Sequence, residues 1–232
     1  ILANTIQPTI GDYFTEKNYR RNYEILRQLT FVFFCISSVV AAGLFSLITP
    51  FICDIWLSPA YELGWGTAVL CIVVLLIKIM GLPLSLMMGV TGLFEKEKNA
   101  GASSAVLNLV VSLALVRPYG MTGVLLGTLL SYLLQICYRY VIFFRDFLEM
   151  KEEAIRYARD LGEYIAMMIL EVAVTRRIIP LIYGNGGMIP FIFCFVLCIL
   201  VPLALNGVFF ERGWRLQSIV KMVRGMKRSG SR

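Results

Sequence analysis

Lys78 is the one cation in the stretch VLCIVVLLIKIMGLPL, residues 69–84, where every other residue is apolar, glycine or proline. An ammonium group at the centre of a bilayer costs about 2.5–3.5 kcal/mol on insertion scales, so we expect it to face a hydrated interior or an anionic partner. Gly81 and Pro83 follow at once and predict a hinge, because proline removes a backbone hydrogen bond and bends a helix. Lys78 is therefore a candidate anion-binding residue. The alternative is a structural pair with an acid elsewhere in the protein.

Four further polar residues interrupt apolar stretches. Arg176 and Arg177 lie near one end of such a stretch, where long cationic side chains either snorkel to lipid headgroups or form a groove for a phosphate. Asn108 and Gln135 are uncharged, and each either bridges two helices or contacts a bound substrate. These four residues join Lys78 as candidate substrate-binding residues.

Several kinds of chemistry are absent from the sequence. It has no histidine, which excludes a histidine-ligated metal and a histidine general base. The six cysteines lie mostly in apolar stretches without CxxC spacing, so we interpret them as small buried side chains. No phosphate-binding loop motif and no paired carboxylates within an apolar stretch occur. We therefore expect no metal, no cofactor and no enzymatic activity.

The composition predicts an all-α membrane protein that crosses the bilayer several times. Hydrophobic residues make up 58% and charged residues 16%, against about a quarter charged in soluble domains. The apolar residues form six blocks that are long enough to cross about 30 Å of hydrocarbon as helices, whereas a barrel would alternate at short intervals. The blocks are residues 30–52, 66–92, 100–116, 120–143, 161–183 and 188–209.

The cations of the connecting segments alternate in number and predict an orientation. Segments 11–29, 93–99, 139–160 and 210–232 hold four, two, five and seven Lys or Arg residues, and the segments between them hold only Arg117. The cation-rich side is normally cytoplasmic, so we expect a cytoplasmic C-terminus. The formal net charge of +7 fits this topology better than nucleic-acid binding, because no basic patch with interleaved stacking aromatics occurs.

We divide the chain into five segments on this basis. The predicted segments are the end of a preceding helix with a cytoplasmic loop (1–29), four transmembrane helices (30–145), an interfacial amphipathic helix (146–160), two additional transmembrane helices (161–209) and a basic cytoplasmic tail (210–232). The tail is expected to contact anionic lipid headgroups, with a plain solvated tail as the alternative.

Three stretches resemble polysaccharide flippases. NLVVSLALVRPYGMTGVLLGTLLSYLLQICYRY is similar to a recurring helix–turn–helix element of that family, with an early Asn, a Y-G-x-x-G turn and a following G-T-x-x-S. The corresponding residues here are Asn108, Tyr119, Gly120, Gly123, Gly127, Thr128 and Ser131. The stretch ANTIQPTIGDYFTEKNYRRNYEILRQL resembles the loop before the ninth helix of the family, and FSLITPFICDIWLSPAY resembles a helix exit. The resemblance covers nearly the whole chain.

The family is the Wzx-type O-antigen and capsule flippases of the multidrug/oligosaccharidyl-lipid/polysaccharide exporter superfamily. The resemblance implies the second lobe of a MATE-like transporter fold plus two additional C-terminal helices, with a missing N-terminal lobe as partner. It also implies a bacterial inner-membrane protein that translocates an undecaprenyl-pyrophosphate-linked oligosaccharide, with Lys78 at the pyrophosphate or at an acidic sugar. The coupled ion gradient and the absence of chemistry on the substrate are likewise implied by the family.

Two other functions are weaker alternatives. A drug or cation antiporter of the same superfamily usually has an acid in its binding lobe, whereas the first four blocks contain Lys78 and no Asp or Glu. A polysaccharide polymerase or glycosyltransferase needs large extracytoplasmic loops, and the longest one predicted here, 53–65, is short.

Overall fold

The protein is all-α throughout the part that the structure describes. This structure, a computed structural model, describes residues 19–62, 64–148, 151–184 and 187–210. The predicted N-terminal segment before Tyr19 and the basic tail after Phe210 lie outside the described residues. The helices are α2 (Tyr19–Pro50), α3 (Trp65–Val90), α4 (Phe94–Tyr119), α5 (Met121–Val141), α6 (Lys151–Tyr183) and α7 (Met188–Phe210), with short π- and 3₁₀-helical turns η1 (Phe51–Trp56), η2 (Pro59–Tyr61) and η3 (Ile142–Phe147).

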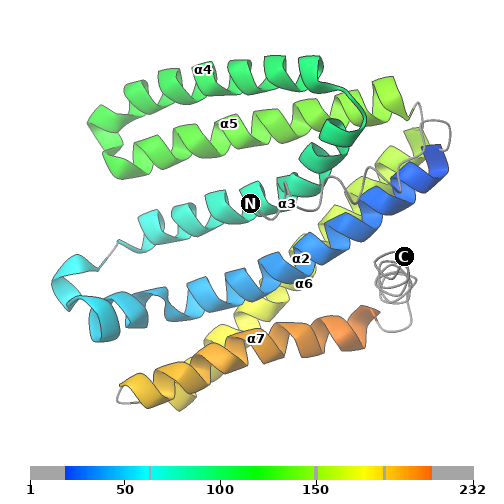
Figure 1. Ribbon diagram of the computed structural model, residues 1–232. Helices are drawn as coiled ribbons and strands as arrows, with labels where there is room; N and C mark the ends of the chain where they lie inside the picture. Colours follow the sequence, from blue (N-terminus) through cyan, green and yellow to red (C-terminus); the bar gives the residue numbers. More distant parts are fainter. Residues whose placement is uncertain (1–18, 63, 149–150, 185–186, 211–232) are drawn as a thin grey trace, which may run out of the picture.

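Five segments are long and apolar enough to cross a membrane, which confirms the prediction of a polytopic helical membrane protein. They are Tyr19–Trp56, Trp65–Val90, Glu95–Tyr119, Met121–Arg145 and Met188–Phe210. The sixth predicted span, 161–183, belongs to α6, which is not among the five because Glu171, Arg176 and Arg177 interrupt its apolar sequence. Figure 1 shows the helices running back and forth, so that the α3–α4 and α5–α6 connections lie at the end of the bundle where α2 begins.

Helix α6 is one continuous helix of 33 residues, whereas the sequence predicted a separate interfacial helix over 146–160. Tyr157 and Asp160, in its first turns, are buried. The Arg27 Nε on α2 donates a hydrogen bond to Asp160 Oδ2 over 2.7 Å, and Tyr157 packs in the same core as Tyr23 and Phe144. The apolar side of this segment therefore faces the bundle, where helix–helix packing buries it. At about 50 Å, the helix is longer than the hydrocarbon core.

Helix α2 is the central element of the bundle and contacts α3, α6 and α7 (Figure 1). Aromatic side chains fill the junction with α6 and α7. Phe34 stacks on Tyr164 with ring centroids 4.6 Å apart, and Phe31 and Phe210 contact the same pair edge-on or tilted. Large rigid rings in such arrangements contribute beyond the area that they bury. This junction holds the three helices together.

Helices α4 and α5 form a close pair at the other side of the bundle. A Cβ atom added at Gly123 would collide with Leu115, and one added at Gly127 would collide with Ser112. The glycines therefore allow the helix backbones to approach, as the G-x-x-x-G spacing predicts. Helix α4 contacts little of the chain besides α5. Its outer face is apolar and exposed, with Val106, Leu109, Val110, Leu113 and Val116.

Candidate functional site

A polar pocket of about 130 Å³ lies between α3 and α5. Helical periodicity explains its lining, because residues three, four and seven positions apart share one face of a helix. Helix α3 contributes Ile77, Lys78, Gly81, Leu82 and Ser85, and α5 contributes Tyr132, Gln135, Ile136 and Arg139. Of the predicted substrate-binding residues, the structure thus brings Lys78 and Gln135 together.

Lys78 is exposed on the isolated chain, and its side chain reaches toward α5. The ammonium nitrogen lies 5.9 Å from the centroid of the Tyr132 ring, within the range of a cation–π contact. Within the part of the chain that the structure describes, no carboxylate forms an ion pair with this nitrogen. The ammonium group of Lys78 is therefore available to pair with an anionic ligand.

The second cation of the pocket is already paired. Arg139 Nη2 lies 2.6 Å from Glu97 Oε1, and the Ser85 hydroxyl donates a hydrogen bond to the same oxygen over 3.0 Å. Glu97 lies in the first turn of α4, where the helix dipole favours a negative charge. The sequence assigned Glu97 and Arg139 to connecting segments, but both are helical and both face this site. Because their charges cancel, the net charge of the pocket is that of Lys78.

Gly81 provides the close contact between α3 and α5. A Cβ atom added there would lie 3.1 Å from side-chain carbons of Ile136, so a larger residue would push the helices apart. Helix α3 is continuous through Gly81 and Pro83, and its last turns run up toward α4 (Figure 1). The predicted hinge therefore lies beside the pocket, because Gly81 is one of its lining residues and Pro83 follows within the same helix.

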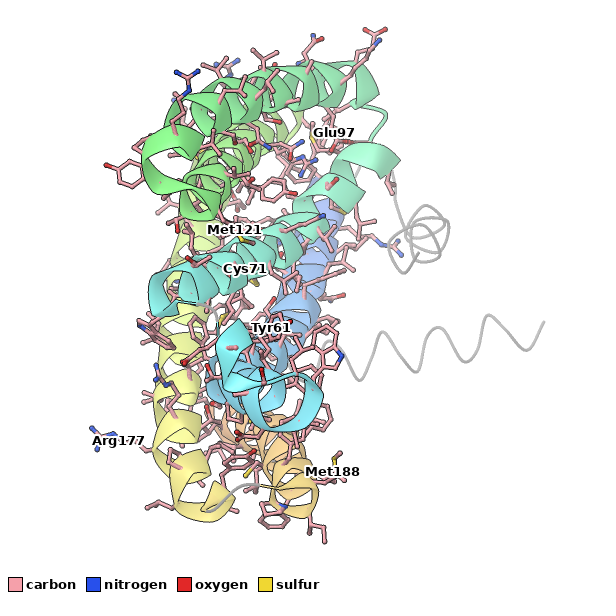
Figure 2. The ribbon with its side chains drawn as sticks, turned by 90° about the vertical axis from the view of Figure 1, so that its left-hand side faces the viewer. Tyr61, Cys71, Glu97, Met121, Arg177 and Met188 are labelled. Carbon is pink, nitrogen blue, oxygen red and sulfur yellow. The ribbon has the colours of Figure 1, made fainter. Side chains whose placement is uncertain are left out.

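The structure places the other three predicted residues elsewhere. Asn108 lies between α4 and α5, where its Oδ1 accepts a hydrogen bond from Ser112 over 2.9 Å. The Arg176 guanidinium lies 4.4 Å from the ring centroid of Trp65, at the start of α3. Arg177 is exposed and projects away from α6 (Figure 2). None of the three lines the pocket around Lys78.

Four residues of the site were not among the predicted binding residues. They are Ser85, Tyr132 and Arg139, which line the pocket, and Glu97, which pairs with Arg139 beside it. Ser85 is seven residues from Lys78, and Arg139 is four residues from Gln135, so both pairs fit the helical repeat. Starting from Lys78 and Gln135, that spacing could therefore have predicted Ser85 and Arg139 as further residues of the site. Glu97 carried no such signal, since it comes from a third helix.

An apolar groove of about 580 Å³ lies on another part of the bundle, between α2, α3 and α7. Its walls are almost entirely aliphatic and aromatic, with Val39, Val40, Leu44, Leu47, Ile48, Phe51, Leu75, Phe191, Phe195 and Ile199 among its lining residues. Gly43 leaves room in its wall, because nothing lies within 4 Å of a Cβ atom added there. The surface can accommodate a hydrocarbon chain but offers no ionic partner.

Comparison with known proteins gives no match: no family model, no curated protein and no solved structure is similar to this chain at a significant level. The classification therefore rests on the helices themselves. Their length and hydropathy identify the chain as a multi-pass helical membrane protein with five candidate transmembrane helices.

Proposed function

We propose that this chain belongs to a flippase that carries an undecaprenyl-pyrophosphate-linked oligosaccharide across the bacterial inner membrane by alternating access. The observation that carries the proposal is the pocket between α3 and α5, in which Lys78 supplies an uncompensated positive charge at mid-span. The resemblance to oligosaccharide flippases supplies the identity of the cargo.

The chemistry of the pocket suits an anionic headgroup that carries sugars. Lys78 can bind a phosphate or a sugar carboxylate, and the Gln135 amide and the Tyr132 hydroxyl can exchange hydrogen bonds with sugar hydroxyls. A volume of about 130 Å³ equals roughly four water molecules at about 30 Å³ each. The pocket is thus sized for one phosphate or part of one sugar ring. The rest of the headgroup would lie in a cavity shared with the N-terminal lobe.

The apolar groove supports the same kind of cargo. A polyprenyl carrier has a long hydrocarbon chain attached to its pyrophosphate, and apolar surface is the environment that such a chain prefers. The groove between α2, α3 and α7 offers that surface on the same chain as the cationic pocket. A binding surface with one charged region and one separate apolar region matches an amphipathic lipid better than a small soluble solute.

The proposed orientation places the pocket in the cytoplasmic half of the membrane. Lys78 lies midway along α3, while Ser85 and Arg139 lie nearer the ends that connect to cation-rich segments. By the positive-inside rule those ends are cytoplasmic. Cargo synthesised on the cytoplasmic side would therefore meet the Glu97–Arg139 pair first and Lys78 deeper in the span.

The test is transport by the complete protein in liposomes that contain a lipid-linked oligosaccharide. Lys78→Ala is expected to lower transport more than tenfold at an unchanged protein level, and Lys78→Arg is expected to keep part of it, because the charge remains. Lys98→Ala, on the exposed start of α4, is the matched control and should transport normally. Full transport by Lys78→Ala would overturn the proposal. Efflux of cationic drugs by the wild type, without movement of the lipid, would favour the antiporter alternative.

A further inference from the structure

A second residue of a charged type lies inside a long helix, in a different part of the bundle. Glu171 of α6 is 0% exposed and lies at the junction of α2, α6 and α7. Among the described residues, neither of its carboxylate oxygens has a hydrogen-bond partner. An ionised carboxylate without partners in such surroundings is strongly unfavourable, so the group needs either a bound cation or a proton.

Neutral polar side chains surround the carboxyl. Ser38 of α2 and Asn206 of α7 lie beside it, although neither meets the geometry of a hydrogen bond to it. The Asn206 amide nitrogen donates to Ser38 Oγ over 3.1 Å, and Ser38 Oγ donates to the Cys35 carbonyl over 3.1 Å. Asn206 Oδ1 is buried and receives no hydrogen bond. The junction therefore contains three buried acceptor oxygens without a hydrogen bond from any described residue, namely the two carboxylate oxygens of Glu171 and Asn206 Oδ1.

The helices around Glu171 supply no compensating charge. Helix α7 has no charged residue within its bounds, and the only charged residue of α3 is Lys78, which lies in the polar pocket. The last charged residue of α2 is Arg27, which is paired with Asp160, and the thiol of Cys35 on the same helix lies near enough to Glu171 to be affected by its charge. The remaining charged and titratable neighbours on α6 and α7 do not pair with it either.

The titratable neighbours of Glu171 on α6 and α7 make other contacts or carry no positive charge. On α6, Tyr164 stacks on Phe34, the acid Glu163 adds no positive charge, and the guanidinium of Arg176 lies against Trp65. On α7, the titratable groups are Cys194 and Cys198, of which Cys198 Sγ donates to the Ala42 carbonyl over 3.7 Å. All of these groups leave the Glu171 carboxyl without a cationic partner among the described residues.

We infer that Glu171 is a proton-binding site, in which the protonated carboxyl donates a hydrogen bond to Asn206 Oδ1. Protonation removes the buried charge and gives the carboxyl an O–H that can donate to the unpaired Asn206 Oδ1, so one proton satisfies both groups. A metal ion fits less well, since hard cations need six or more oxygen ligands or several waters. No metal-binding group of three or more His, Cys, Asp or Glu side chains exists in the described ranges, and the Ser38 hydroxyl is already engaged on two sides.

This inference does not depend on the cargo. Within the proposed flippase, a proton site between α2, α6 and α7 would be the place where a proton gradient acts on the bundle. Opening the junction would hydrate the carboxyl and release the proton, and closing it would require a proton again. The site is sealed in the packing described here, so proton exchange and helix separation are linked.

The experiment is infrared spectroscopy of the complete protein in lipid at neutral pH, without cargo. The wild type is expected to show the carbonyl stretching band of a protonated carboxylic acid, and Glu171→Gln, which is neutral and nearly isosteric, should lose it. The band should also disappear at alkaline pH. Absence of the band from the wild type, or its persistence in Glu171→Gln, would overturn the inference. Conversion of the band to a carboxylate signal by added sodium at constant pH would also overturn it, in favour of a metal-cation site.

A second variant tests the assigned acceptor and keeps the inference testable if Glu171→Gln does not fold. Asn206→Leu retains the carboxyl but removes Oδ1, so the carbonyl band should remain and move to the frequency of a less hydrogen-bonded acid. An unchanged band position would contradict the Glu171–Asn206 pairing. Because these spectra need no substrate, a failed transport assay and a failed proton site are distinguishable.

Discussion

The surroundings of Lys78 and Glu171 differ, although both are charged residue types near the middle of a long helix. Lys78 is exposed on the isolated chain and borders a pocket between two helices, whereas Glu171 is fully buried where three helices meet. The cation can keep its charge and attract a ligand. The acid must be neutralised in place. A charged residue within a span therefore acquires its role from the packing around it, and not from its depth alone.

The largest expected effect tests this difference by reversing the charge at each of the two positions. Glu171→Lys buries an ammonium in the α2–α6–α7 junction without an acid to pair with it. A central charge costs about 2.5–3.5 kcal/mol on insertion scales, so the variant should unfold at a clearly lower temperature and reach lower membrane levels. Thermal unfolding of the purified protein in detergent measures this. Lys78→Glu is the matched control and should keep normal stability, and equal loss in both variants would contradict the comparison.

The next effect concerns the charge balance of the pocket. Arg139→Ala releases Glu97, whose carboxylate would then be free to compensate Lys78. We expect the affinity for a short-chain lipid pyrophosphate to fall by about tenfold, equivalent to about 1.4 kcal/mol. Titration calorimetry on the complete protein measures it. The double variant Arg139→Ala/Glu97→Gln should recover most of the affinity, as neighbouring residues are expected to be coupled. Additive losses would show that Arg139 contacts the ligand itself.

A smaller effect compares one glycine from each region. Gly81→Ala places a Cβ atom against Ile136, whereas Gly162→Ala on α6 meets nothing within 4 Å. Gly162→Ala should stabilise the protein by about 0.4–1 kcal/mol, because it restricts the unfolded chain. Gly81→Ala should gain less stability or lose some, and should weaken binding in the pocket. Equal unfolding midpoints in denaturant for the two variants would argue against a tight α3–α5 contact.

An effect of similar size concerns the contact between Lys78 and Tyr132. Tyr132→Leu removes the aromatic face, and exposed cation–π contacts contribute about 0.5–1 kcal/mol. We expect a two- to fivefold loss of affinity for the lipid pyrophosphate, and Tyr132→Phe should retain most of the affinity. If the phenylalanine variant lost as much as the leucine variant, the hydroxyl and not the ring would be the important group.

The sequence predicted the helical architecture better than the helix limits. Apolar runs identify the part of a helix that crosses hydrocarbon, but they do not show where the helix continues into water. For that reason Glu97 was assigned to a loop, although α4 begins at Phe94, and 146–160 was treated as separate from the helix that begins at Lys151. The burial of Tyr157 against its neighbours could not be inferred from periodicity alone, since an apolar stripe faces either lipid or protein.

The site was only partly predictable for the same physical reason. Lys78 is conspicuous because a cation in an apolar run is unfavourable unless something compensates it. The sequence does not show which helices are neighbours, so the meeting of Lys78 with Gln135 and Arg139 required the fold. Glu171 is an acid within a predicted apolar block, but its position near the outer half of that block made it a weak candidate for a coupling-ion site. Its importance follows from its burial and from the unpaired acceptor oxygens at the junction.

The isolation of α4 from most of the bundle has a consequence for biogenesis. The stretches that contain α4 and α5 have mean hydropathies of 1.6 and 1.5, the lowest of the five candidate spans. They are joined by a tight turn at Gly120, whose φ of 56° suits glycine. These two spans are the least apolar of the five, and pairing shields their polar atoms, since the Ser112 hydroxyl of α4 donates a hydrogen bond to the Val124 carbonyl of α5 over 3.4 Å. We therefore expect the insertion machinery to release them into the bilayer as a preassembled hairpin, after α3 and before α6.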